Sequence, residues 1–83
     1  MSNNPPVQTL RDGALKASIW RNDRGDGGQF YSVTLGRTYT DDQDKVQTAD
    51  NFSGSHLLKL AHLMGRVYDR LAELREIDKK RAA

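Results

Sequence analysis

Two aromatic side chains and four cations in the first half of the chain are the residues best suited to bind a ligand. Trp20 and Phe30 can stack on planar groups such as unpaired bases, because every base has a π-face. Cations near them, at strand ends and in loops, can contact phosphates. The candidate nucleic-acid-binding residues are Lys16, Trp20, Arg21, Arg24, Phe30 and Arg37. The alternative is that Trp20 and Phe30 are ordinary cross-strand partners or lie in a dimer contact.

Catalytic and metal-binding patterns have little support in the sequence. His56 and His62 are six positions apart, which puts them about 240° apart around a helix, so they cannot share a metal ion. The acidic run of Asp41, Asp42 and Asp44 lacks the glycine and glutamate of a calcium-binding loop. We therefore predict a protein that is not an enzyme and has no cofactor and no metal site.

Composition predicts a single small cytoplasmic domain. With 83 residues and no cysteine, the chain has room for one domain and forms no disulfide. Its apolar runs are too short to span a membrane, and its first residues do not form a signal peptide. A domain this small buries only about 60% of its unfolded surface, so additional burial in a dimer would stabilise it.

Charge is distributed unevenly along the chain. Residues 1–52 carry six Lys or Arg against seven acids, a net −1, and residues 53–83 carry seven against four, a net +3. The basic surplus therefore lies on the predicted helix and its end. A strong nucleic-acid binder usually has a more basic surface than this.

The first half of the chain has the period-two pattern of a hairpin-rich sheet. Residues 1–6 are predicted to be a disordered leader, because paired prolines cannot join a strand ladder. Asp12-Gly13 predicts a tight type I′ turn, and Gly36 predicts a bulge or a close backbone approach. Alternating residues predict strands over 7–11, 14–22, 30–39 and 46–52, the last of them weaker and at an edge.

The second half predicts one long helix from Ser55 to Leu74, with Ser53 or Ser55 as its cap. Arg75 and Asp78 interrupt its apolar stripe, so burial is expected to stop near Leu74, leaving residues 76–83 as a solvated basic helix end. Several stripe residues also have heptad spacing, which is typical of either a core-facing stripe or a dimer contact. The stripe comprises Leu57, Leu60, Ala61, Met64, Val67, Tyr68, Leu71 and Leu74.

Together these elements predict a single α+β domain over residues 7–75. A four-stranded antiparallel meander would carry the helix on one face, and the opposite face would stay open because one helix covers only one face. Strand parity puts Lys16, Trp20 and Phe30 on the open face. The helix-covered face would carry Leu15, Ala17, Ile19, Tyr31, Val33 and Leu35.

The hairpin Val7–Trp20 and the closing helix resemble the small β4α proteins that bind single-stranded nucleic acids. That group includes transcriptional coactivators of the positive-cofactor-four type, the plant Whirly proteins and the PUR repeats. The chain is also similar to small uncharacterised bacterial proteins, which implies no function. The β4α resemblance implies single-stranded DNA or RNA as the ligand of the open sheet face. The alternative prediction is a protein-interaction module or accessory regulator that acts as a homodimer.

Overall fold

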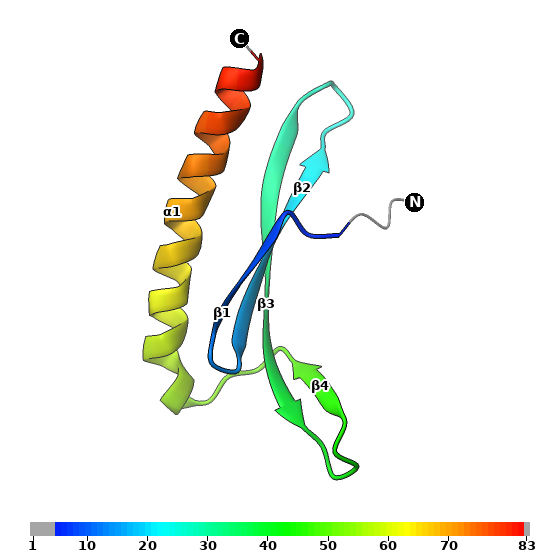
Figure 1. The fold of residues 1–83 in the computed structure, drawn as a ribbon, viewed down its shortest axis with the longest axis vertical. Coiled ribbons are helices and arrows are strands. Elements are labelled where there is room, and N and C mark those ends of the chain that lie inside the picture. Colours follow the sequence, from blue (N-terminus) through cyan, green and yellow to red (C-terminus); the bar gives the residue numbers. More distant parts are fainter. Residues whose placement is uncertain (1–4, 83) are drawn as a thin grey trace.

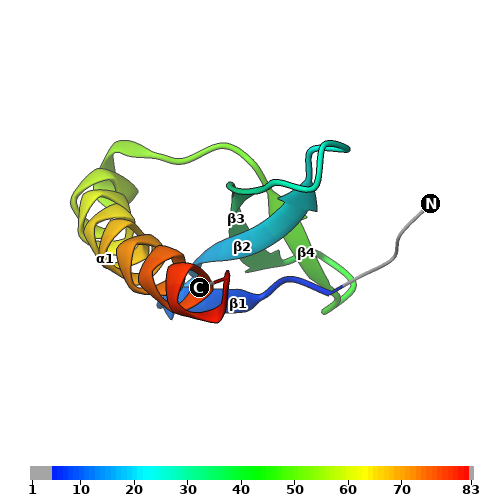
Figure 2. The ribbon, with the colours of Figure 1, turned by 90° about the horizontal axis from the view of Figure 1, so that it is seen from above.

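The computed structural model describes residues 5–82, which form four strands followed by one long helix. The strands are β1 (Gln8–Asp12), β2 (Leu15–Asp23), β3 (Gln29–Thr40) and β4 (Val46–Ala49); a short 3-10 turn, η1 (Gly54–His56), leads into helix α1 (Leu57–Ala82). The strands pair antiparallel in the order β1-β2-β3-β4, with α1 on one face (Figures 1 and 2). The predicted fold class is confirmed. Most of the predicted leader, residues 1–4, and Ala83 lie outside the described residues.

The turn between β1 and β2 lies one residue later than predicted. It is formed by Gly13 and Ala14, and β1 continues through Asp12. Gly13, at the first central position, has a φ of 61°, whereas Ala14 at the second does not have a positive φ, which indicates a type II′ rather than a type I′ turn. Arg11 therefore pairs with Lys16, whereas a turn at Asp12-Gly13 would have put it opposite Ala14.

Gly36 makes a close approach and not a bulge. The pairing of β2 with β3 is continuous from Leu15 opposite Arg37 to Asp23 opposite Gln29. A Cβ at Gly36 would lie 2.9 Å from Thr48 Cγ2 and 3.3 Å from Lys16 Cε. The missing side chain thus leaves room for the aliphatic part of Lys16 to lie across β3.

The fourth strand is shorter than predicted and lies at an edge of the sheet. It ends at Ala49, and the chain then leaves the sheet to reach α1. Phe52, predicted to be part of the strand, is half-buried and packs against the core. Burial of this ring explains why the strand ends early, because a continued ladder would hold Phe52 at the sheet edge.

The helix is longer than predicted, and only part of the predicted stripe faces the sheet: Leu60, Met64, Val67, Leu71 and Leu74 pack in or against the core. Its fully buried residues are Leu63, Val67 and Leu74, whereas Leu57 and Tyr68 of the predicted stripe are 58% and 73% exposed. The helix lies mainly over β1 and β2 (Figure 2). Its orientation is fixed by Arg66, which donates to the Arg11 carbonyl, and by Arg70, which donates to Gln8 Oε1.

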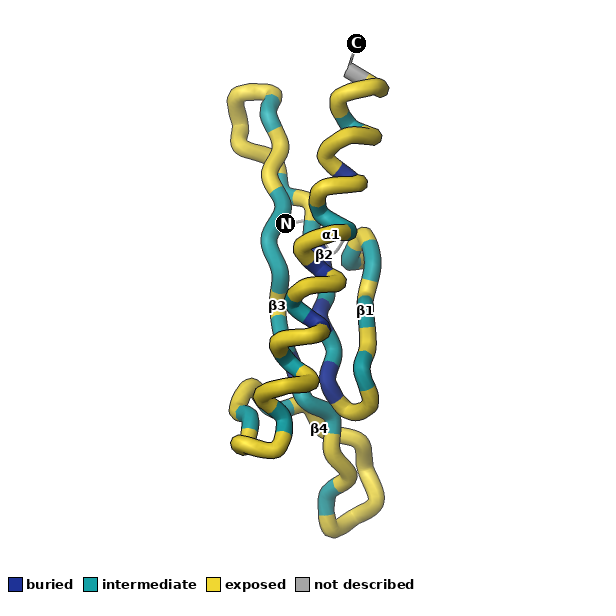
Figure 3. The backbone as a smooth tube through the Cα atoms, turned by 90° about the vertical axis from the view of Figure 1, so that its left-hand side faces the viewer, coloured by how far each residue is buried: buried dark blue, intermediate teal, exposed yellow. Residues whose placement is uncertain are grey.

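The core lies between α1 and the face of β2 that was predicted to be covered. Leu15, Ala17 and Ile19 are at most 1% exposed and pack with the buried helix residues (Figure 3). Val33 and Leu35 on β3 share this face but stay half-buried, because the helix is centred over the neighbouring strands. The predicted covered face is confirmed.

The molecule is a thin two-layer structure. Its extents are 50 × 31 × 15 Å, with a Cα radius of gyration of 15.3 Å; a compact chain of this length has about 12 Å. In the part of the chain that the structure describes, no helix is long and apolar enough to cross a membrane.

Candidate nucleic-acid interface

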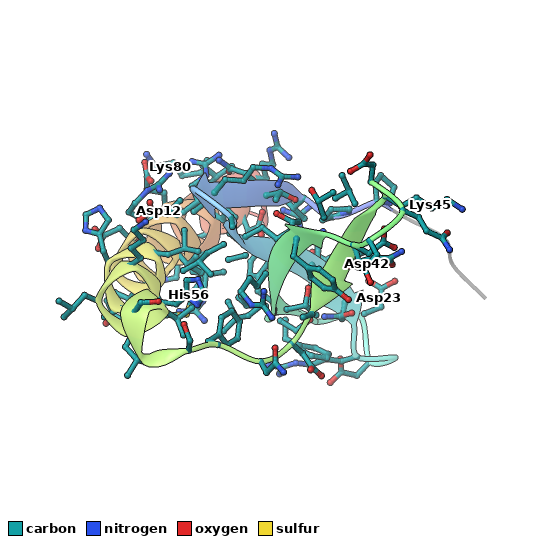
Figure 4. All side chains as sticks on the ribbon, turned by 90° about the horizontal axis from the view of Figure 1, so that it is seen from below. Asp12, Asp23, Asp42, Lys45, His56 and Lys80 are labelled. Carbon is teal, nitrogen blue, oxygen red and sulfur yellow. The ribbon has the colours of Figure 1, made fainter. Side chains whose placement is uncertain are left out.

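The sheet surface that α1 leaves uncovered, which we call the open face, is polar and, within strands β1 to β4, free of carboxylates. The strand acids, Asp12 and Asp23, share the parity of the core-facing residues, and Figure 4 shows Asp12 beside the helix. The open face thus carries only hydroxyl, amide, apolar and cationic side chains. Its residues in the strands are Thr9, Arg11, Lys16, Ser18, Trp20, Asn22, Phe30, Ser32, Thr34, Gly36, Thr38, Thr40, Val46 and Thr48.

Trp20 lies near the middle of the open face, on β2. Its indole Nε1 donates a 2.9 Å hydrogen bond to Thr34 Oγ1, so the ring extends across β3. Next to it, Asn22 donates to Ser32 Oγ at 2.9 Å. The bond to Thr34 fixes the indole ring, and the Trp20 side chain remains partly exposed. An indole held in this way can serve as a platform for a planar group, with little entropy lost on binding.

Arg11 and Lys16 form a pair of like charges directly opposite each other on β1 and β2. Like charges at directly opposite positions of an antiparallel ladder repel each other. Among the described residues, neither side chain forms an ion pair with a carboxylate. Both cations therefore remain available to contact an anion, such as a phosphate. The sequence did not reveal this pair, because a turn at Asp12-Gly13 predicts Ala14 opposite Arg11.

Arg21 lies on the helix side of the sheet and not on the open face. Its guanidinium donates to the Tyr31 hydroxyl at 2.7 Å and to Asp78 Oδ1 at 3.0 Å. The hydrogen bond with Tyr31 raises the pKa of Arg21, and the nearby Asp78 carboxylate acts in the same direction. With these bonds Arg21 connects the sheet to the end of α1.

Arg24 and Phe30 lie at the β2–β3 hairpin, at one end of the molecule. The guanidinium carbon of Arg24 is 6.0 Å from the centre of the Phe30 ring, within range of a cation–π interaction. Both line a surface groove of about 510 Å³ between the hairpin and the last turns of α1, where Arg75 and Lys79 also lie. Tyr31 and Asp78 line the groove as well, so it combines aromatic and cationic side chains with one carboxylate and is distinct from the carboxylate-free open face.

Arg37 organises the linker between β4 and α1. Its Nε donates to the Asn51 carbonyl at 2.9 Å and its Nη2 to Asn51 Oδ1 at 2.8 Å. The guanidinium also lies 5.4 Å from the Tyr39 ring centre. By parity Arg37 points to the helix side, so its observed role is structural.

The six predicted residues are thus divided among three places. Lys16 and Trp20 lie on the open face, Phe30 and Arg24 lie at its hairpin end, and Arg21 and Arg37 lie on the other side of the sheet.

Comparison with protein-family models, with curated proteins and with solved structures found no match for this chain. Residues 5–82 contain no group of three or more side chains that could hold a metal ion.

Proposed function

We propose that this protein is a small non-enzymatic binding protein that holds single-stranded DNA or RNA across the open face. The observation that carries the proposal is the uncompensated Arg11–Lys16 pair on the same carboxylate-free surface as Trp20. Cations without acidic partners supply phosphate contacts, and the fixed indole supplies a stacking surface. Such a ligand fits the cytoplasmic location that the sequence predicts.

A single strand fits this surface better than a duplex does. Stacking on Trp20 requires a base whose face is free, which only an unpaired strand offers. Lys16 and Trp20 are four residues apart on β2, about 13 Å along a strand. One strand can therefore contact the cations with its phosphates and the indole with a base a few nucleotides away.

The test is a titration with oligothymidylate at low salt, followed by tryptophan fluorescence. Trp20 is the only tryptophan, so quenching reports on this surface alone. Stacking is worth about 1–3 kcal/mol per base, so Trp20→Ala should weaken binding by that amount; affinity for this variant is measured by mobility shift. Lys16→Ala should reduce the slope of log affinity against log salt by about 0.7 in magnitude.

Lys59→Ala is the matched control, because Lys59 is an equally charged, exposed residue on α1. It should leave the Trp20 quenching and affinity nearly unchanged. Absence of quenching and of a mobility shift with the unmodified protein would refute the proposal. Equal losses in Lys16→Ala and Lys59→Ala would show only a diffuse charge effect and would rule out the open face as the site.

A further inference from the structure

A second apolar stripe on α1 is exposed to solvent and lies beside the core-facing stripe. Leu58 is 86% exposed and Tyr68 is 73% exposed, and the positions between and after them carry small residues. At 100° per residue these positions lie within an arc of about 80°. They also have the alternating three- and four-residue spacing of a helix–helix contact. We call them the outer stripe: Leu58, Ala61, Gly65, Tyr68 and Ala72.

Gly65 stands in the middle of this stripe and has no structural explanation within its own chain. A glycine inside a helix is less stable than an alanine. A Cβ added at Gly65 would meet nothing within 4 Å, so no neighbouring element of the same chain requires its absence. A second helix that crosses α1 at Gly65 would require a residue without a side chain there, because small residues at a crossing allow two helix axes to approach closely.

The surface area of the molecule also indicates a missing partner. The accessible surface is 6310 Å² for a 9.4 kDa chain, whereas a compact monomer of this mass exposes about 5,000 Å². The difference exceeds the roughly 800 Å² per partner that a standard stable interface buries. Among the residues whose burial the structure describes, only six apolar side chains form the buried core. The excess belongs to the whole molecule, and burial of the outer stripe in a dimer would remove part of it.

We infer that the outer stripe is the contact surface for a second copy of this chain, packed antiparallel about a twofold axis near Gly65. The two chains then contact each other through the same surface, as closed dimers do. Leu58 and Ala72 are equally distant in sequence from Gly65, so Leu58 fits over the small Ala72 of the second copy. Because the stripe is on the helix, both open faces remain accessible, and the inference does not depend on the proposed ligand.

The charges beside the outer stripe complement each other in this arrangement. His62 and Asp69 lie along the same flank of the stripe, at almost equal distances before and after Gly65. In the antiparallel dimer, His62 of one copy therefore lies beside Asp69 of the second copy. Glu76 comes next to the first turn of the second copy's α1, a turn with no acidic residue of its own. An acid near a helix N-terminus is stabilising. A parallel dimer would form neither the His62–Asp69 contact nor the contact between Glu76 and the first turn of α1.

The first test is the molecular mass of the full chain in solution, measured by sedimentation over a wide concentration range. The unmodified protein should reach twice the monomer mass of 9.4 kDa. Leu58→Glu and Tyr68→Glu should each shift it to the monomer with an unchanged circular dichroism spectrum, since both side chains are exposed in the single chain. Ile77→Glu, a similar change at an exposed residue on the other flank of α1, should remain a dimer. A monomer at every concentration would overturn the inference.

The second test determines the orientation by cross-linking. The chain has no cysteine, so any disulfide comes from introduced residues. In the antiparallel dimer the double variant Leu58→Cys/Ala72→Cys should form covalent dimers on mild oxidation, while Leu58→Cys alone should not, because a disulfide requires Cβ atoms about 4 Å apart. Efficient cross-linking of the single variant would overturn the antiparallel arrangement. The outcome is independent of nucleic-acid binding, so failure of either proposal leaves the other standing.

Discussion

The Tyr31 hydroxyl donates a 2.5 Å hydrogen bond to Asp78 Oδ2 and thereby joins β3 to the last turns of α1. Asp78 also pairs with Arg21 through its other oxygen, at 3.0 Å. This polar cluster continues the helix–sheet contact beyond Leu74, the last buried residue of the helix. It explains why an acid lies on the core-facing side of α1, where the sequence predicted only an interruption of the apolar stripe.

Disrupting this cluster should loosen the end of the helix. We expect Asp78→Asn to lower the free energy of unfolding by about 1–2 kcal/mol, a moderate value because the ion pair is partly exposed. Tyr31→Phe, which removes only the hydroxyl, should have a similar effect. Urea denaturation of both single variants and the double variant gives the coupling energy. Strictly additive effects would show that the two side chains do not act together.

The orientation of α1 can be checked with two leucines. Leu63 is fully buried and Leu58 is 86% exposed. Leu63→Ala should lower the free energy of unfolding by about 2–5 kcal/mol, because it removes transfer energy and leaves a cavity. Leu58→Ala, measured in dilute solution where association does not contribute, should change it by less than about 0.5 kcal/mol. Thermal or urea denaturation measures both, and the reverse ranking would contradict the observed orientation.

Replacing Gly36 and Gly65 by alanine should change the free energy of unfolding in opposite directions. At Gly36 the new Cβ would crowd Thr48 and Lys16, and we expect a loss of roughly 1–3 kcal/mol, as in other overpacked sites. At Gly65 it would meet nothing, and the helix should gain up to about 1 kcal/mol in the monomer. Urea denaturation of the dilute protein measures both changes. A neutral Gly36→Ala would show that the Thr48 and Lys16 side chains can both move aside freely.

The β3–β4 turn should depend on pH through Asp41. The Asp41 carboxylate accepts hydrogen bonds from the backbone N–H of Lys45 and Gln43 and from the Gln47 side chain, and these bonds lower its pKa. Because the pKa in the folded state is lowered, the stabilisation is present above the unfolded-state pKa and is lost as the pH falls through the folded-state value. Amide hydrogen exchange at Gln43 and Lys45 should accelerate on acidification. Asp41→Asn should abolish this dependence, whereas Asp42→Asn should preserve it.

Strand parity was predictable from the sequence because it is a local property. The side chains of a strand alternate between two faces, so the covered position of Ile19 and the open position of Trp20 followed from the pattern of β2 alone. The fold class followed for the same reason, since four short alternating runs and one long apolar-periodic segment have few ways to pack.

Register and helix orientation were decided by tertiary structure. A shift of the turn by one residue, from Asp12-Gly13 to Gly13-Ala14, changes every partner of β1, and this shift brings Arg11 opposite Lys16. The sequence defined a broad apolar stripe on α1, but which part of it is buried depends on where the helix lies over the twisted sheet. Packing over β1 and β2 buries Leu63 and exposes Tyr68. The partners of Arg21 and Arg37 come from residues distant in sequence, so local patterns could not predict them.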